Sequence, residues 1–333
     1  MSLLTLLAAL AASSSAVSVD PARSPGPAEV VAAAQADDWQ PIAPADLLVM
    51  DLAPDAAARP RRVVIQLLPA PFSQGWIGNI RTLAAAHWWD GTSINRAQDN
   101  YVVQWGDPEG ENPGLAKPLP PGLQAVPQSA YGVRAGSGDR TVSPEELDVW
   151  LATIEATHAT WHALSRKTDA SKDADPYADD TFFFRGWPIA ASRKGPSAWP
   201  VHCYGSVGVG RDYPPDTGSG AELYAVIGHA PRQLDRNIAV VGRVIEGIAH
   251  LSTLPRGTAD LGFYATPGER VPILSIRMGD AVPGLPAYQY LSTESTTFHR
   301  YADAVANRRD RFFIQPAGGA DICNVKVPVR RVP

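Results

Sequence analysis

Short runs of aliphatic, β-branched and aromatic residues recur along the chain, and Gly, Pro, Asp or Asn separates one run from the next. Runs of this length between turn residues are typical of β-strands, and many short strands of this kind pack as a sandwich or a barrel. The 28 Gly and 31 Pro among 333 residues supply the turns that such a fold needs. We predict strands at residues 46–52, 62–68, 92–96, 101–105, 206–210, 222–227, 239–244 and 273–278.

A few segments have helical spacing instead. Apolar residues recur every three or four positions through 77–88, which ends at an Asp-Gly turn, and through 245–251, which Pro255 terminates. Residues 298–305 place Phe, Tyr, Ala and Val on one face. The helix signal over 143–161 is well defined, with Ser as cap, Pro in the first turn and Glu three residues after the cap. The chain is therefore expected to be mainly β with a few helices.

Charge and composition exclude several classes of partner. With 29 basic and 34 acidic residues the net charge is −5, and no basic run offers a surface for a phosphate backbone, so no nucleic-acid partner is expected. No apolar stretch approaches the ~20 residues of a membrane-spanning helix. The sequence leaves the oligomeric state open.

The first 18 residues resemble an export signal. A Leu/Ala run within residues 3–12 precedes small residues up to Ser18, which is the order found in signal peptides, so we expect an exported protein, periplasmic or secreted. Residues 19–45, rich in Ala, Pro and Asp, are interpreted as a tether. In an oxidising compartment Cys203 and Cys323 either form a disulfide or stay two separately buried thiols, and the sequence leaves both readings open.

Several motifs that could carry other chemistry fail on their spacing. His158 and His162 are four residues apart, but the Glu that a zinc peptidase needs between them is missing. The acidic residues of 169–180 lack the spacing of a calcium-binding loop, and the glycines of 205–210 occur in the wrong order for a dinucleotide loop. No G-x-S-x-G is present. We therefore expect neither a metal nor another cofactor.

The stretch from Trp89 to Pro108 reads WDGTSINRAQDNYVVQWGDP. It resembles the signature of the cyclophilin-type peptidyl-prolyl isomerases, in which Asp-Gly-Thr leads to an Arg, then to an aromatic residue, then to Gln-x-Gly-Asp-Pro. A second block, from Glu222 to Gly247, resembles the family's later strands in the same order. The residues of the first block in register with the family are Asp90, Gly91, Thr92, Arg96, Tyr101, Gln104, Gly106, Asp107 and Pro108.

This resemblance implies a closed eight-stranded antiparallel barrel capped by two helices, with a peptide groove on its outside. The barrel domain would span residues 46–280, with a long helix-containing insertion at 109–198 beside the groove. Residues 281–333 would be a C-terminal extension.

The resemblance also implies an activity, the isomerisation of X–Pro bonds in client proteins, and a set of catalytic residues. Arg96 would donate a hydrogen bond to the prolyl nitrogen of the twisted amide. Gln104 would orient Arg96 and contact the substrate, with Tyr101 beside them. Proline-containing peptide segments are therefore the expected partners.

The substrate socket is expected to contain Val102, Tyr224 and Leu234, with Glu222 and Gly210 beside the peptide backbone. This chain departs from active members of the family, which commonly have Met, Phe, Gln, Trp and His where it has Val102, Tyr224, Glu222, Gln233 and Ile238. Tyr224 brings a hydroxyl that needs a partner when buried, and Glu222 is expected to pair with Arg96 or to favour basic substrates.

Two functions remain open at this point. The first is an exported prolyl isomerase. The second is a non-catalytic peptide-binding or scaffold module, in which the insertion covers the groove. An open socket at Arg96 favours the first, whereas Trp150 or Trp161 packed over Arg96 favours the second.

Overall fold

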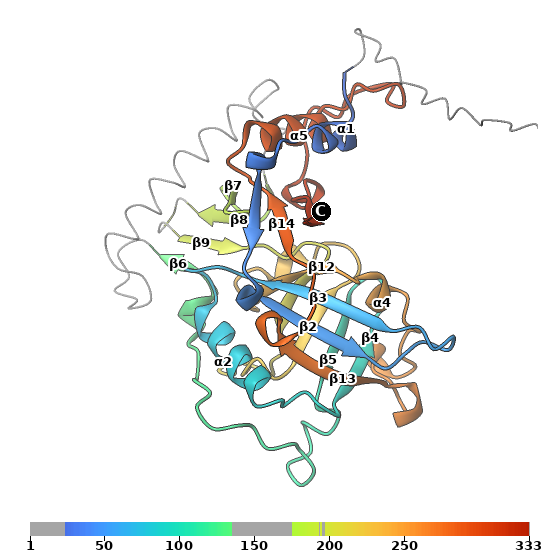
Figure 1. The fold of residues 1–333 in the computed structure, drawn as a ribbon. Helices are drawn as coiled ribbons and strands as arrows, with labels where there is room; N and C mark the ends of the chain where they lie inside the picture. The colour runs from blue at the N-terminus through green and yellow to red at the C-terminus, as the bar shows by residue number, and fades with distance from the viewer. Residues whose placement is uncertain (1–23, 135–174, 193, 195–196, 333) are drawn as a thin grey trace, which may run out of the picture.

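The structure is a computed structural model that describes residues 24–134, 175–192, 194 and 197–332. Its centre is a closed barrel of eight antiparallel strands (Figure 1), in the order β10-β11-β5-β4-β13-β2-β3-β12. All eight are the strands predicted from the sequence, with bounds within two residues of those expected. They are β2 (Leu47–Leu52), β3 (Arg61–Leu67), β4 (Ser93–Ala97), β5 (Val102–Gly106), β10 (Ser206–Val209), β11 (Leu223–Val226), β12 (Val240–Glu246) and β13 (Val271–Met278).

Side chains along each strand alternate between the inside and the outside of the barrel, and those that point inward form its core. On β3, Val63, Ile65 and Leu67 belong to the main core, whereas Val64 on the opposite face packs against residues of the extension. Helix α2 (Gln74–Ala85) covers the core with its apolar face, as predicted. The second predicted helix is a single turn, α4 (Ala249–Ser252), because the chain stays in β12 as far as Glu246.

Part of the segment predicted to be a tether is folded. Within residues 24–45, helix α1 (Pro27–Ala32) packs on α5 (Thr296–Ala306) of the extension, and strand β1 (Trp39–Ile42) pairs with β14 (Tyr288–Leu291). Strand β15 (Val329–Arg331) completes this three-stranded sheet. The composition of the segment suggested a tether, but Val30, Trp39 and Ile42 are buried, so tertiary contacts order it.

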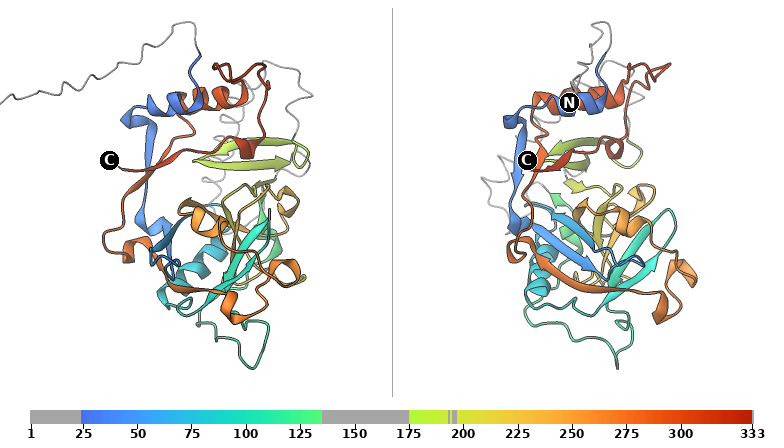
Figure 2. Two further views of the ribbon diagram at one scale, coloured as in Figure 1. Left: turned by 90° about the vertical axis from the view of Figure 1, so that its right-hand side faces the viewer. Right: turned by 45° about the vertical axis from the view of Figure 1, so that its right-hand side comes forward.

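The described part of the insertion forms a second small sheet, of β6 (Val133–Arg134), β7 (Asp180–Phe184), β8 (Trp187–Ser192) and β9 (Ser197–Pro200). In Figure 2 the hairpin of β7 and β8 lies between the barrel and the layer of α1 and α5. Successive side chains of β7 point to opposite faces of the sheet. Phe182 and Phe184 belong to the barrel core, and Phe183 belongs to a cluster with Phe298 of α5. The sheet therefore attaches the C-terminal extension to the barrel.

Some expected features fall outside the described residues. These are the export signal at 1–18, the helix at 143–161 with Trp150, His158 and Trp161, and His162 directly after it. The expected helix at 298–305 is confirmed as α5, whose cap Ser295 accepts a hydrogen bond from the Phe298 N–H. Within the described ranges, no helix has the length and apolar character needed to cross a membrane.

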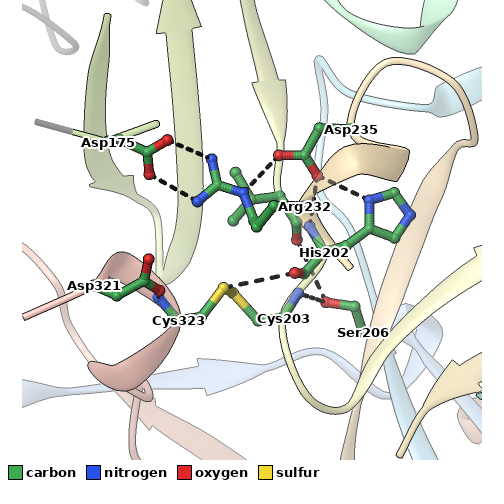
Figure 3. The surroundings of a disulfide bond; sticks show 9 residues. Asp175, His202, Cys203, Ser206, Arg232, Asp235, Asp321 and Cys323 are labelled. Atoms are coloured by element: carbon green, nitrogen blue, oxygen red, sulfur yellow. Dashed lines mark hydrogen bonds and ion pairs between the residues drawn. A yellow bond between two sulfur atoms is a disulfide. The ribbon is translucent and has the colours of Figure 1, made fainter. Parts of the chain in front are cut away.

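Cys203 and Cys323 form a disulfide across 120 residues of sequence, which decides between the two readings left open above (Figure 3). Cys203 precedes β10 of the barrel, and Cys323 lies in the 3₁₀ turn of residues 322–324. The bond ties the extension to the barrel wall.

We expect the double change Cys203→Ser and Cys323→Ser to lower the free energy of unfolding by about 2–4 kcal/mol, because the unfolded chain loses a long cross-linked loop. Chemical denaturation measures this. Reductant should destabilise the wild type by a similar amount and leave the double variant unchanged, since the chain has only 2 Cys. A wild type that unfolds at the same denaturant concentration with and without reductant would contradict this role.

Candidate active site

Strand register brings the central site residues into one row on the outside of the barrel. Arg96 on β4 lies opposite Gln104 on β5, Gln104 lies opposite Tyr224 on β11, and Tyr224 lies opposite Gly208 on β10. Directly opposed residues of neighbouring strands share a face. The alternate residues Val103 and Ala225 are in the barrel core, so this row faces outward.

Three hydrogen bonds hold the guanidinium of Arg96. Its Nε donates to the Leu261 carbonyl at 2.8 Å, one Nη donates to Gln104 Oε1 at 3.2 Å, and the other donates to Gln98 Oε1. A guanidinium has five N–H donors, and three of those of Arg96 have partners among the described residues. The group is thus fixed in orientation and still has donors for a substrate.

Aromatic rings also surround Arg96. The guanidinium carbon is 5.5 Å from the centre of the Tyr101 ring and 5.2 Å from that of Phe263. These are cation–π distances. The residue is half-buried, and burial lowers the pKa of its guanidinium, which nevertheless stays charged in proteins. Removing water around the charge strengthens any hydrogen bond it gives to a substrate.

An apolar cluster lies beside this charge. Val102, Tyr224 and Val226 are buried together, and Tyr101 and Ile238 pack against them. Tyr101 therefore contacts both Arg96 and the cluster. Leu234 ends the 3₁₀ turn of residues 232–234, is half-buried, and accepts the Ile238 backbone N–H at 3.1 Å. The predicted socket residues are thus close to one another in the fold.

The hydroxyl of Tyr224 has the partner that burial demands. It lies 2.8 Å from Nε2 of His202, whose side chain is fully buried. Burial raises the pKa of the Tyr224 phenol well above its ordinary value, so the phenol stays protonated. It donates to Nε2 when the histidine proton is on Nδ1, the nitrogen that faces Asp235. A side chain on Gly208 would collide with this hydroxyl, which explains the glycine opposite the tyrosine.

His202 begins a chain of buried polar contacts that continues to the insertion (Figure 3). Its Nδ1 lies 2.9 Å from Asp235 Oδ1, and Asp235 Oδ2 accepts from Arg232 Nε at 2.7 Å. Arg232 also donates to both oxygens of Asp175, at 2.8 and 3.1 Å. Burial lowers the pKa of Arg232, but its bonds to the two carboxylates outweigh this and raise it. The socket is therefore supported from behind by a charged network.

Glu222 and Gly210 lie next to Gln104. The amide of Gln104 donates to Glu222 Oε2 at 2.6 Å, and the Gly210 N–H donates to the Glu222 carbonyl at 2.9 Å. Among the described residues Glu222 forms no ion pair with Arg96, so that expected pairing is wrong: Gln104 hydrogen-bonds to both side chains instead. Gln104 is thus held by Arg96 on one side and by Glu222 on the other.

Burial of Glu222 raises the pKa of its carboxyl above the ordinary 4.5, and nearby Asp107 and Glu111 add to this. Since the folded-state pKa exceeds the unfolded one, the wild type loses stability as the pH rises from about 4.5 through the folded pKa. We therefore expect Glu222→Gln to raise the melting temperature at pH 8 and to give no gain near pH 4. Asp280→Asn, which removes an exposed carboxylate at the end of β13, is the control and should show no such pH-dependent gain; equal gains in both variants would contradict the role of burial.

Sequence reasoning placed Arg96, Gln104, Tyr101, Val102, Tyr224, Glu222, Gly210 and Leu234 in this region, and the fold brings them together. It missed Gln98 and Phe263, which hold Arg96, and His202, which holds Tyr224. Only one signal pointed to any of these: a buried tyrosine hydroxyl requires a partner. Nothing in the sequence identified that partner.

Comparisons with known proteins identify a family and a fold. The family model for cyclophilin type peptidyl-prolyl cis-trans isomerase/CLD matches residues 70–278, more than half of the chain. The solved structure of cyclophilin AquaCyp293 from Hirschia baltica matches with a TM-score of 0.59 and 18% identity, over 88% of this chain and 92% of that one. A cyclophilin type peptidyl-prolyl cis-trans isomerase from Cryptosporidium parvum has a TM-score of 0.35 and 11% identity, over 69% and 98%. No curated protein sequence matches the chain.

Proposed function

The chain belongs to the family of cyclophilin-type peptidyl-prolyl cis-trans isomerases, and from that premise we propose that it accelerates X–Pro isomerisation in exported proteins with Arg96 as the catalytic donor. The single observation that carries the mechanism is the row of Arg96, Gln104 and Tyr224 beside a buried apolar cluster. It combines a fixed cation with apolar side chains beside it, of which Tyr101 and Leu234 are partly exposed and available to a proline ring.

The reaction needs no bond to break. Amide resonance imposes a rotation barrier of ~18–20 kcal/mol, and uncatalysed isomerisation takes ~10–100 s. As the amide twists, resonance is lost and the prolyl nitrogen recovers a lone pair that accepts a hydrogen bond. A free N–H of Arg96 stabilises this twisted state and not the planar ground state, which is the condition for catalysis.

The neighbours of Arg96 have separate roles in this mechanism. Gln104, Gln98 and the Leu261 carbonyl fix the guanidinium before substrate arrives, so that little reorganisation accompanies the reaction. Val102, Tyr224 and Leu234 receive the proline ring, and Tyr101 joins the two parts of the site. Glu222 and Gly210 lie where the peptide backbone passes and favour substrates with a basic residue near the proline.

The proposed place of action is outside the cytoplasm. The apolar run within residues 3–12 supports export, and a disulfide between Cys203 and Cys323 is typical of oxidising compartments. Cell fractionation tests this: we expect the mature protein, lacking the first residues, in the periplasmic or secreted fraction. Full-length protein in the cytoplasmic fraction alone would refute export.

The activity is tested by following cis-to-trans relaxation of short X-Pro peptides with the full chain present. We expect the rate to rise in proportion to protein concentration. A peptide with Lys before the proline should be accelerated more than one with Glu, because of Glu222. If several X-Pro peptides bind without acceleration, the non-catalytic binding module is the better description.

A further inference from the structure

A cavity lies between the barrel and the C-terminal extension, apart from the row of Arg96, Gln104 and Tyr224. Its volume is about 210 Å³. Strands β10 and β12 of the barrel, β8 and β9 of the insertion and the last residues of the extension all contribute to its walls, and the disulfide is part of them. It is larger than the engineered cavity of about 150 Å³ that holds a benzene molecule in another protein. It therefore has room for a small organic ligand.

Arg243 lines this cavity without a carboxylate partner. Its Nε and one Nη donate to Gln66 Oε1 at 3.0 and 2.8 Å, and the other Nη donates to the Gly186 carbonyl at 2.7 Å. No Asp or Glu is among the described residues that line the cavity. Burial lowers the pKa of Arg243 to about 10, so the guanidinium is charged at neutral pH. Two of its five N–H donors have no partner among the described residues.

An aromatic ring and a second cation also line the cavity. Trp187 is 3% exposed, and its ring centre is 4.5 Å from the Arg243 guanidinium carbon. Lys326 brings a second positive charge, and its Nζ lies over the Tyr204 ring at 4.7 Å. Most of the remaining wall is apolar, with Val201, Ile322 and Val327 among its residues.

We propose that this cavity binds a small monocarboxylate with an apolar body. A carboxylate supplies the two acceptor oxygens that the fork of Arg243 matches, and it neutralises a half-buried cation that has no acid among the residues lining the cavity. The apolar walls accept an aliphatic or aromatic body. A cationic ligand would face two like charges, and a neutral one would leave Arg243 without a counter-charge.

The test uses hexanoate and its neutral isostere hexanamide, titrated into the full chain by calorimetry. We expect hexanoate to bind at least tenfold more tightly than hexanamide. Arg243→Gln should remove most of this preference, and Lys326→Gln, at an exposed position on the rim, should weaken hexanoate binding severalfold. Arg59→Gln, an exposed arginine in the turn between β2 and β3, is the matched control and should bind hexanoate like the wild type.

Two results would overturn the proposal. One is equal or undetectable binding of hexanoate and hexanamide by the wild type at millimolar concentrations. The other is full retention of the preference in folded Arg243→Gln, with folding checked by circular dichroism. If Arg243→Gln does not fold, Lys326→Gln decides: unchanged hexanoate affinity in that variant counts against the site, and a severalfold loss that hexanamide does not share supports it.

Discussion

Arg96→Ala is expected to slow the catalysed isomerisation of an X-Pro peptide by about 10²–10³-fold in kcat/KM, the range found when one transition-state donor is removed. The structure gives the reason. Three hydrogen bonds and two aromatic rings fix this guanidinium beside the apolar cluster, and no second arginine or lysine occupies the described row on β4, β5 and β11. The measurement is the relaxation rate at several protein concentrations.

Two further variants distinguish the loss of the Arg96 hydrogen bond from the nonspecific effects of replacing an arginine. Arg96→Lys keeps the positive charge but not the planar fork, so it should recover only a minor part of the rate. Arg62→Ala removes an arginine from β3 that pairs with Asp51, and should leave the rate within about twofold of wild type. A folded Arg96→Ala variant with wild-type rate would exclude Arg96 as the donor.

Arg232→Met is expected to produce the largest loss of stability, about 3–5 kcal/mol in the free energy of unfolding. Arg232 is 3% exposed and bonds to Asp175 and Asp235, whose side chains are 7% and 4% exposed. Removing the cation leaves two buried carboxylates without a counter-charge. The loss should appear as a lower midpoint in chemical denaturation.

The matched control is Arg256→Met, because Arg256 pairs with Asp99 at the surface. We expect that change to cost less than about 1 kcal/mol. Adding Asp175→Asn to Arg232→Met should restore part of the lost stability, since one uncompensated charge disappears. If Arg232→Met and Arg256→Met destabilise equally, the buried network does not have the energetic role assigned to it.

The barrel was predictable because its strands carry local signals. Each strand has an apolar run bounded by turn residues. This local pattern is almost sufficient to predict the strand and its pairing with its neighbours. The spacing of Arg96, Tyr101 and Gln104 was equally visible, because all three lie on one hairpin of β4 and β5.

Other features of the site depend on contacts between distant parts of the chain. His202 and Tyr224 are 22 residues apart, Asp175 and Arg232 are 57 apart, and Gln104 and Glu222 are 118 apart. No periodicity or spacing connects such pairs. The same reason explains the segment before β2. Its composition resembles a tether, yet Trp39 becomes buried because it pairs with Leu291 of β14, about 250 residues later in the chain.

The sequence by itself therefore determined the barrel, its family and the residues of the row proposed to be catalytic, since these depend on local alternation and on motifs within single hairpins. Only the tertiary structure decided that the two cysteines are bonded, that Tyr224 is held by His202, and that Arg243 lines a cavity without a counter-charge. The physical reason is that burial and electrostatic pairing arise from the whole packed chain, and no short stretch of residues contains that information.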